Sequence, residues 1–188
     1  MKVKGQRAKV KGKGAKGEGK TLRAILGALL IALAVPAVAS AQQMVIFVRH
    51  AERADGGPAA ATMTGAPADP LLSPAGQARA AKLATMLAEA GVKAIFATEF
   101  HRTQDTGKPL AAKLGIEVQS IPGNDTAALV AKVKAKYSKD VVLIIGHSNT
   151  VPAAIKAFGG PVVTMRDDEY DAIYVLNPAT GACTLIRY

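Results

Sequence analysis

The pattern of apolar and polar positions divides residues 42–188 into short apolar runs that alternate with amphipathic segments. Continuous apolar runs are typical of strands covered on both faces, and amphipathic segments with capping residues are typical of helices packed on a sheet. The pattern predicts strands at 44–49, 93–98, 116–121, 140–147, 170–177 and 182–188, and helices at 73–91, 101–115, 125–137 and 150–160. The last two strands read as a hairpin. The alternation predicts an α/β fold, a three-layer α/β/α sandwich with a mostly parallel central sheet.

The first 41 residues have a different pattern. They contain nine Lys or Arg residues and one acidic residue, followed by an uncharged apolar stretch at 24–41 that ends in Ala39-Ser40-Ala41. A basic start, an apolar middle and a small-x-small end are typical of a secretory signal. We therefore expect a signal peptide with a long basic region at 1–41, cleavage after Ala41, and export, most simply to the periplasm. An uncleaved membrane anchor or a nucleic-acid-binding arm are the alternatives.

Charge and composition limit the classes of binding partner that we expect for residues 42–188. The chain carries a net charge of +10, but residues 42–188 contain 15 basic and 13 acidic residues and are close to neutral. We therefore expect no nucleic-acid partner, and membrane contact only through the N-terminal segment. Cys183 is the one cysteine, so an intramolecular disulfide is impossible, and we expect it to be a small buried residue. The sequence has no metal-binding motif, and we expect no metal and no cofactor.

Candidate chemistry lies at the ends of two predicted strands. His50 follows the first strand and His147 ends the fourth, although the chain has only three histidines. The carboxyl ends of parallel strands lie at one edge of a sheet, so the two side chains are expected to meet. Arg49 precedes His50, and Arg102 lies at the start of a predicted helix, where anions are favoured. These four residues could converge on a tetrahedral oxyanion.

A pocket of this kind suits phosphoryl transfer to histidine. A neutral imidazole is a nucleophile, and a covalent intermediate divides one difficult step into two. Nearby arginines disfavour the imidazolium and neutralise the charge of the transferring phosphoryl group. The residues thus indicate phosphoryl transfer to histidine without a metal.

Four motifs resemble the histidine phosphatase superfamily, also called phosphoglycerate mutase-like: "VRHAE", "LSPAGQARA", "ATEFHRTQDT" and "GHSNT", over about residues 44–158. The resemblance implies a phosphoglycerate mutase-like fold with His50 as the phosphorylated nucleophile. It makes Arg49, Arg102 and His147 the rest of the phosphate pocket, with Arg53 and Thr98 as further candidates to line it. Ser73 and Gly76 match the family's helix start and are expected to be structural.

The sequence does not identify the general acid of the predicted site and leaves two candidates. The phytase and acid-phosphatase branch has an Asp directly after the second histidine, and Ser148 stands there instead. Asp125 lies in a stretch comparable to the loop that supplies the acid in the mutase branch, but it would also serve as a helix N-cap. Glu52 is the second candidate, and its alternative is an ion pair with an arginine in the pocket wall. Glu99 is expected to be a solvated charge at a helix start.

The sequence therefore predicts an exported phosphatase that acts on phosphomonoesters, or on a phosphoprotein, through a phosphohistidine intermediate. Its expected partner is a small phosphorylated substrate. The short domain leaves little chain for a cap, so the pocket should be open. The alternative is a non-catalytic envelope module that binds phosphate in the same pocket.

Overall fold

The computed structural model of the chain describes residues 43–55 and 69–188. These residues belong to one compact unit. The expected signal peptide at 1–41 lies outside them, as does most of the loop at 56–68. Within the described ranges, every helix is too short or too polar to cross a membrane.

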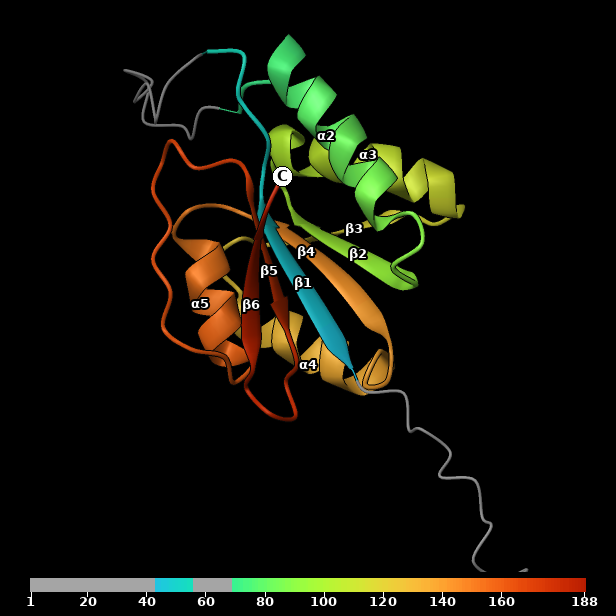
Figure 1. The fold of residues 1–188 in the computed structure, drawn as a ribbon, viewed down its shortest axis with the longest axis vertical. Coiled ribbons are helices and arrows are strands. Elements are labelled where there is room, and N and C mark those ends of the chain that lie inside the picture. The colour runs from blue at the N-terminus through green and yellow to red at the C-terminus, as the bar shows by residue number, and fades with distance from the viewer. Residues whose placement is uncertain (1–42, 56–68) are drawn as a thin grey trace, which may run out of the picture. The chain divides into compact units, whose positions relative to one another are not determined.

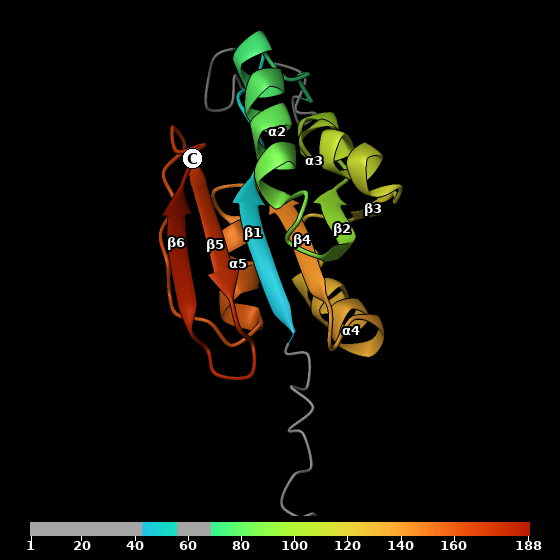
Figure 2. The ribbon, with the colours of Figure 1, turned by 45° about the vertical axis from the view of Figure 1, so that its right-hand side comes forward.

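A six-stranded sheet forms the centre of the fold, in the order β3-β2-β4-β1-β5-β6. Neighbours are parallel from β3 to β1, and β5 and β6 are antiparallel additions at the other edge. In Figure 2 the arrows of β1, β2 and β4 all point the same way. The strands are β1 Met44–Arg49, β2 Val92–Thr98, β3 Val118–Ile121, β4 Val141–Gly146, β5 Ala172–Leu176 and β6 Cys183–Arg187.

Two pairs of helices cover the two faces of the sheet (Figure 1). One face packs against α2 and α3 through a cluster that includes Leu83 and Leu110, and the other packs against α4 and α5 through a cluster that includes Val133 and Ile155. Both faces of the central strands are therefore buried, which explains their continuous apolar runs. The helices are α2 Pro74–Leu87, α3 His101–Leu114, α4 Thr126–Lys136 and α5 Thr150–Ala157. The predicted three-layer α/β/α fold is confirmed.

The structure differs from the predicted elements in local details. Helix α2 ends at Leu87, and a turn rather than a further helical turn leads to Gly91, whose φ is 71°. Gly107 and Pro109 suggested a disturbance within the predicted helix at 101–115, but α3 continues through both residues. A Cβ added at Gly107 would lie 2.9 Å from a methyl group of Ile145, so glycine lets the helix approach the sheet closely. Cys183 is half-buried rather than fully buried.

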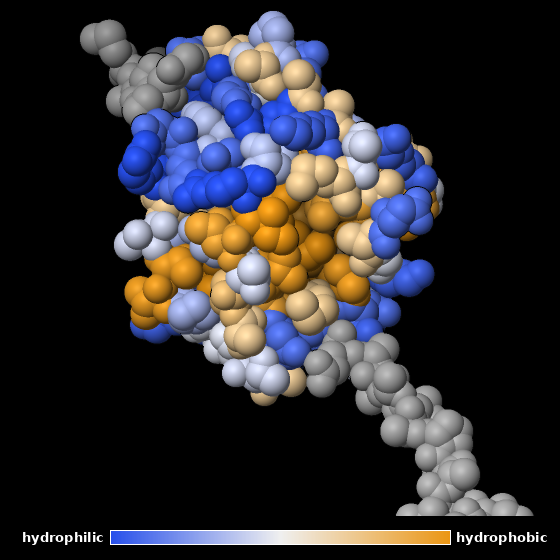
Figure 3. Space-filling model, viewed as in Figure 1, coloured by the Kyte–Doolittle hydropathy of each residue, from blue (hydrophilic) through white to orange (hydrophobic). Residues whose placement is uncertain are grey.

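The sheet extends beyond the helices on the α2/α3 side. Figure 3 shows an apolar area across this face, next to hydrophilic residues nearer the loops. Ile186 pairs with Ile173, whose side chain belongs to the cluster under α2 and α3, yet Ile186 is 43% exposed. The hairpin edge of the sheet is therefore only partly covered on this side.

Candidate functional site

The register of β1 and β4 brings the two histidines together. The strands are parallel, and Arg49 lies opposite Gly146. His50 and His147, each the next residue, therefore leave the sheet side by side, with ring centroids 5.2 Å apart. The backbone N–H of His50 donates to the Gly146 carbonyl at 2.9 Å, which extends the ladder as far as the site. The predicted meeting of the two strand ends is present in the structure.

His50 is held as a neutral imidazole. The residue is 2% exposed, and Nδ1 lies 2.7 Å from the carbonyl oxygen of Ala51. A carbonyl oxygen only accepts, so Nδ1 carries the proton and Nε2 keeps its lone pair. Burial, together with the positive charge of Arg49, lowers the pKa of His50 to about 3, although the bond to Ala51 opposes the shift. His50 is thus an unprotonated ring with one nitrogen available at neutral pH.

His147 is fixed from behind by two threonines. Its Nε2 lies 2.9 Å from the hydroxyl of Thr98, and its backbone N–H donates to the hydroxyl of Thr150 at 2.8 Å. Burial and then the charges of Arg102 and Arg49 lower the pKa of His147 to about 4. Thr98 thus contacts His147 but does not line the pocket in front of His50.

Three arginines surround the histidines, and all three are buried. Arg49 ends β1, and Arg102 lies in the first turn of α3, with its guanidinium 4.3 Å from the ring of Phe100. Arg53 follows in the loop after His50 and forms an ion pair with Asp55. The sequence predicted Arg49 and Arg102 here and named Arg53 as a candidate, and all three line one pocket with both histidines.

The start of α3 is already occupied by a carboxylate. Asp69 accepts from the backbone N–H of His101 at 2.8 Å and lies 3.5 Å from Nη1 of Arg102. The sequence suggested that this helix start would hold a bound anion. In the structure Asp69 takes that place, so the remaining positive charge of the site comes from the arginine side chains.

We call the hollow between these residues the His50 pocket; its volume is about 470 Å³. Two carboxylates line it, Glu99 and Asp167. Glu99 accepts from the backbone N–H of Gly123 at 2.8 Å, and Asp167 accepts from the hydroxyl of Ser148 at 2.5 Å. The other lining residues are Arg49, His50, Arg53, Phe100, Arg102, Gly123, Asn124, His147, Ser148, Asn149 and Thr150.

Sequence reasoning missed both carboxylates. Glu99 comes directly after a strand that ends at the site, which is a signal that could have identified it. Asp167 lies in the long connection between α5 and β5, and no motif marks it.

Glu52 lies outside the His50 pocket. Its carboxylate forms an ion pair with Arg79 of α2, with 2.7 Å between Nη2 and Oε1. Burial alone would raise the pKa of Glu52, but the hydrogen bonds from Arg79 outweigh it and the pKa is lowered. Both residues line a second hollow of about 520 Å³, which we call the Arg79 hollow. Glu52 therefore forms the ion pair foreseen as its alternative role, but its partner Arg79 lies outside the wall of the His50 pocket.

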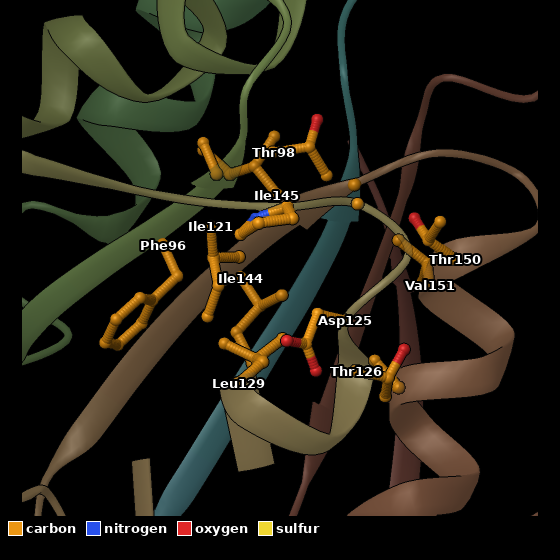
Figure 4. Close-up of a pocket in the computed structure, with 15 residues that line it drawn as sticks. Phe96, Thr98, Ile121, Asp125, Thr126, Leu129, Ile144, Ile145, Thr150 and Val151 are labelled. Carbon is orange, nitrogen blue, oxygen red and sulfur yellow. The ribbon is translucent and has the colours of Figure 1, made fainter. Parts of the chain in front are cut away.

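Asp125 caps a helix and also lies outside the His50 pocket. Its carboxylate accepts from the backbone N–H of Ala128 at 2.9 Å, at the start of α4. It lines a separate, mainly apolar cavity of about 20 Å³, beside Thr126 and Leu129 (Figure 4). That volume holds one water molecule at most. The structure does not bring either predicted acid to His50.

Ser73 and Gly76 fasten the start of α2 to the loop that follows His50. Ser73 caps the helix by accepting from the N–H of Gly76, and its own N–H donates to the Glu52 carbonyl. A Cβ added at Gly76 would lie 2.3 Å from the carbonyl oxygen of Glu52, far inside any real contact. The expected structural role of both residues agrees with these contacts.

Residues 43–55 and 69–188 contain no group of three or more His, Cys, Asp or Glu side chains that could hold a metal ion.

Comparisons with known proteins agree with this geometry. The model of the histidine phosphatase superfamily (branch 1) matches residues 45–123, which include Arg49, His50 and Arg102. No curated protein matches the chain by sequence. Among solved structures, the protein histidine phosphatase SixA complexed with tungstate is 19% identical, with a TM-score of 0.56 over 76% of this chain and 94% of that one.

A second solved structure has the same fold. Mycobacterial glucosyl-3-phosphoglycerate phosphatase is 14% identical, with a TM-score of 0.58 over 77% of this chain and 97% of that one. The family match covers β1, β2 and β3 with helices α2 and α3, and the structural matches cover about three quarters of the chain. Residues 45–123 therefore match the histidine phosphatase superfamily, and the described residues have the fold of these two solved phosphatases.

Proposed function

We propose that the protein is a phosphatase that hydrolyses phosphomonoesters through a covalent phosphohistidine on His50. The observation that carries the proposal is the state of His50: Nδ1 is bonded to the Ala51 carbonyl, and the pKa is lowered to about 3. The ring therefore presents an unprotonated Nε2 in a pocket lined by three arginines. A nucleophile poised in this way needs no separate base to activate it.

In the first step, the phosphate of the substrate binds among the arginines. Nε2 of His50 attacks the phosphorus atom, the ester P–O bond breaks, and its electron pair leaves with the alcohol oxygen. That oxygen takes up a proton, which Glu99 or Asp167 would supply because these are the carboxylates of the pocket wall. The arginine charges stabilise the negative charge that spreads over the transferring oxygens.

In the second step, a water molecule attacks the phosphohistidine. The N–P bond breaks, its electron pair returns to Nε2, and inorganic phosphate leaves. The carboxylate that lost its proton in the first step can accept one from the attacking water. Because arginines supply the positive charge in both steps, we propose that the reaction is independent of metal ions.

The substrate class follows from the size and polarity of the pocket. A hollow of about 470 Å³ with polar walls suits a small phosphomonoester. Two proteins with this fold are named for different phosphorylated groups, a protein phosphohistidine in SixA and glucosyl-3-phosphoglycerate in the mycobacterial phosphatase. A phosphoprotein is therefore a second substrate class to be tested.

We also propose that residues 1–41 direct export and are removed after Ala41. The basis is the order of the basic stretch, the apolar stretch and the Ala-Ser-Ala end. N-terminal sequencing of the protein from a fractionated cell envelope should begin at Gln42, and an intact Met1 terminus would favour an uncleaved anchor.

The test of the activity compares the wild type with His50→Ala on para-nitrophenyl phosphate, with and without a chelator. We expect turnover that resists the chelator, a loss of about a thousandfold or more in the variant, and a phosphoryl group trapped on His50 by acid quench. His101→Ala is the matched control, because this third histidine is exposed and outside the pocket. Equal activity in the His50 variant would refute the nucleophile, and no turnover of any phosphomonoester would favour a phosphate-binding module.

A further inference from the structure

We propose that the segment Arg166–Tyr170 is a clamp that sets the position of Arg49, and that Tyr170 is a positioning residue for the phosphate pocket. We call this the Arg49 clamp; it consists of the backbone carbonyls of Arg166, Asp167 and Glu169 and the ring of Tyr170. The inference rests on the proposed function to the extent that Arg49 binds the substrate phosphate.

The carbonyls hold one end of the guanidinium. Nη1 of Arg49 donates to the carbonyl oxygens of Arg166 at 3.2 Å, of Asp167, and of Glu169 at 3.5 Å. All three bonds fall on the same nitrogen. Carbonyl oxygens are dipoles without net charge, so they orient Arg49 but do not neutralise it as a carboxylate would.

The ring of Tyr170 holds the face of the same guanidinium. Cζ of Arg49 lies 4.2 Å from the centroid of that ring, which is a cation–π contact. The same ring lies 6.0 Å from the ring of His50. Tyr170 therefore contacts the guanidinium and lies near the proposed nucleophile, so its ring can fix the plane of the guanidinium relative to His50.

The clamp leaves one side of the guanidinium unused. Nε of Arg49 is buried and makes no hydrogen bond to any described residue. In a guanidinium, the Nε–H and one N–H of Nη2 point the same way and form a fork that matches two phosphate oxygens. With Nη1 held by carbonyls, this fork is the part of Arg49 that can serve the phosphate. An acceptor there would also satisfy the buried Nε.

Side chains fasten the clamp to two neighbouring elements. Asp167 accepts from Ser148, next to His147, at 2.5 Å, and Glu169 forms a 2.5 Å ion pair with Arg187 of β6. Glu169 also accepts from the backbone N–H of Arg166 at 3.2 Å. The clamp is thus bound to the loop after β4, which carries His147, and to the terminal hairpin of β5 and β6. The antiparallel edge of the sheet therefore helps to arrange the pocket.

The test uses the full chain with Tyr170→Ala, Tyr170→Phe and a control, Asp168→Ala, whose exposed side chain pairs with Arg166 and whose carbonyl does not contact Arg49. We expect Tyr170→Ala to raise both KM for para-nitrophenyl phosphate and the inhibition constant of inorganic phosphate about tenfold, with a smaller change in kcat. Tyr170→Phe keeps the ring and should stay within about twofold of the wild type. A loss confined to kcat, or no change in Tyr170→Ala, would overturn the proposal.

A double-mutant cycle shows whether Tyr170 acts through Arg49. In an Arg49→Ala background, Tyr170→Ala should have no further effect on the inhibition constant of phosphate. An effect as large as in the wild-type background would mean that Tyr170 acts independently of Arg49. Thermal unfolding of each variant checks its fold, and if Tyr170→Ala does not fold, Ser148→Ala loosens the clamp from its other side and should raise the same constants by a smaller factor.

A readout without turnover separates the clamp from the proposed activity. The Nε–Hε signal of Arg49 in labelled protein should be rigid on the nanosecond timescale in the wild type and mobile in Tyr170→Ala. Rigidity without any phosphatase activity would support the clamp and refute the function. Unchanged rigidity in Tyr170→Ala, with an active wild type, would refute the clamp alone.

Discussion

The His50 pocket and the Arg79 hollow have similar sizes, and arginines line both, but their charges are arranged differently. In the Arg79 hollow, Arg79 pairs with Glu52 at 2.7 Å and Arg187 pairs with Asp171 at 2.6 Å. In the His50 pocket, the hydrogen bonds of Arg49 go to backbone carbonyls. The hollow is therefore a network of ion pairs, and in the pocket Arg53 is likewise paired with Asp55, whereas the carbonyl partners of Arg49 leave its positive charge uncompensated.

The difference shows that the hydrogen-bond partners of an arginine indicate its role. The presence of an arginine in a hollow is not enough to do so. Neutral dipoles can position a guanidinium and leave its charge available, while a carboxylate within hydrogen-bond distance cancels that charge. Arg102 is intermediate, because Asp69 lies 3.5 Å away and its approach is looser than that of the pairs in the hollow. Phosphate could replace Asp69 on Arg102 more easily than it could replace Glu52 on Arg79.

The strongest test of this difference is to remove one arginine from the His50 pocket and one from the Arg79 hollow. Arg49→Ala should lower kcat/KM for para-nitrophenyl phosphate by about 100-fold to 1000-fold, because it removes charge at the transferring phosphoryl group. Arg79→Ala should change kcat/KM by less than about threefold and lower the free energy of unfolding by about 1 kcal/mol, since its ion pair is partly exposed. Steady-state kinetics and urea unfolding measure the two effects, and equal kinetic losses would contradict the distinction.

The carboxylates of the pocket wall provide a second test. If Glu99 or Asp167 protonates the leaving group, Glu99→Gln or Asp167→Asn should slow an alkyl phosphate by about 100-fold. Para-nitrophenyl phosphate should be slowed much less, because its leaving group departs without a proton. Glu52→Gln is the comparison from the hollow. A larger loss in that variant than in the other two would move the acid back to Glu52.

The two histidines of the His50 pocket predict a smaller effect of pH. Their pKa values of about 3 and about 4 in the folded state lie below the ordinary value of 6.5, so kcat/KM should have an acidic limb near pH 4 after correction for ionisation of the substrate. The unfolded chain binds protons on these histidines between about pH 6.5 and pH 4 and the folded chain does not. The free energy of unfolding should therefore fall as the pH is lowered through that window, and His147→Gln should show a shallower slope in urea unfolding.

Most of the fold could be predicted from the sequence because its signals are local. The apolar runs of β1 and β4 and the capping residues of α2 and α4 depend on neighbouring residues only. The end of α2 at Leu87 is less predictable, because the alanine-rich residues that follow would also suit a helix. The path of α3 through Gly107 depends on the packing of that residue against Ile145, which no local pattern reveals.

The residues of the site also divide into those that the sequence could predict and those that it could not. Arg49, His50, Arg102 and His147 lie at the ends of regular elements, so the topology alone brings them together. Whether a carboxylate reaches the His50 pocket depends on the direction of its side chain, which the topology alone does not determine. Asp125 lies close in the chain to the pocket-lining Asn124, yet its carboxylate turns back to cap α4. Asp167 reaches the pocket because the long connection before β5 wraps around Arg49, a contact between residues more than a hundred positions apart in the chain.

Gly76 has a consequence for mutational scans of this protein. Any other residue there would place a carbon atom 2.3 Å from the carbonyl oxygen of Glu52, two residues after His50. A library scored by phosphate release should therefore find position 76 as intolerant as position 50, although Gly76 takes no part in bond making. Only a second score for the amount of folded protein would distinguish the two positions, because substitutions at His50 should leave folded protein and those at Gly76 should deplete it.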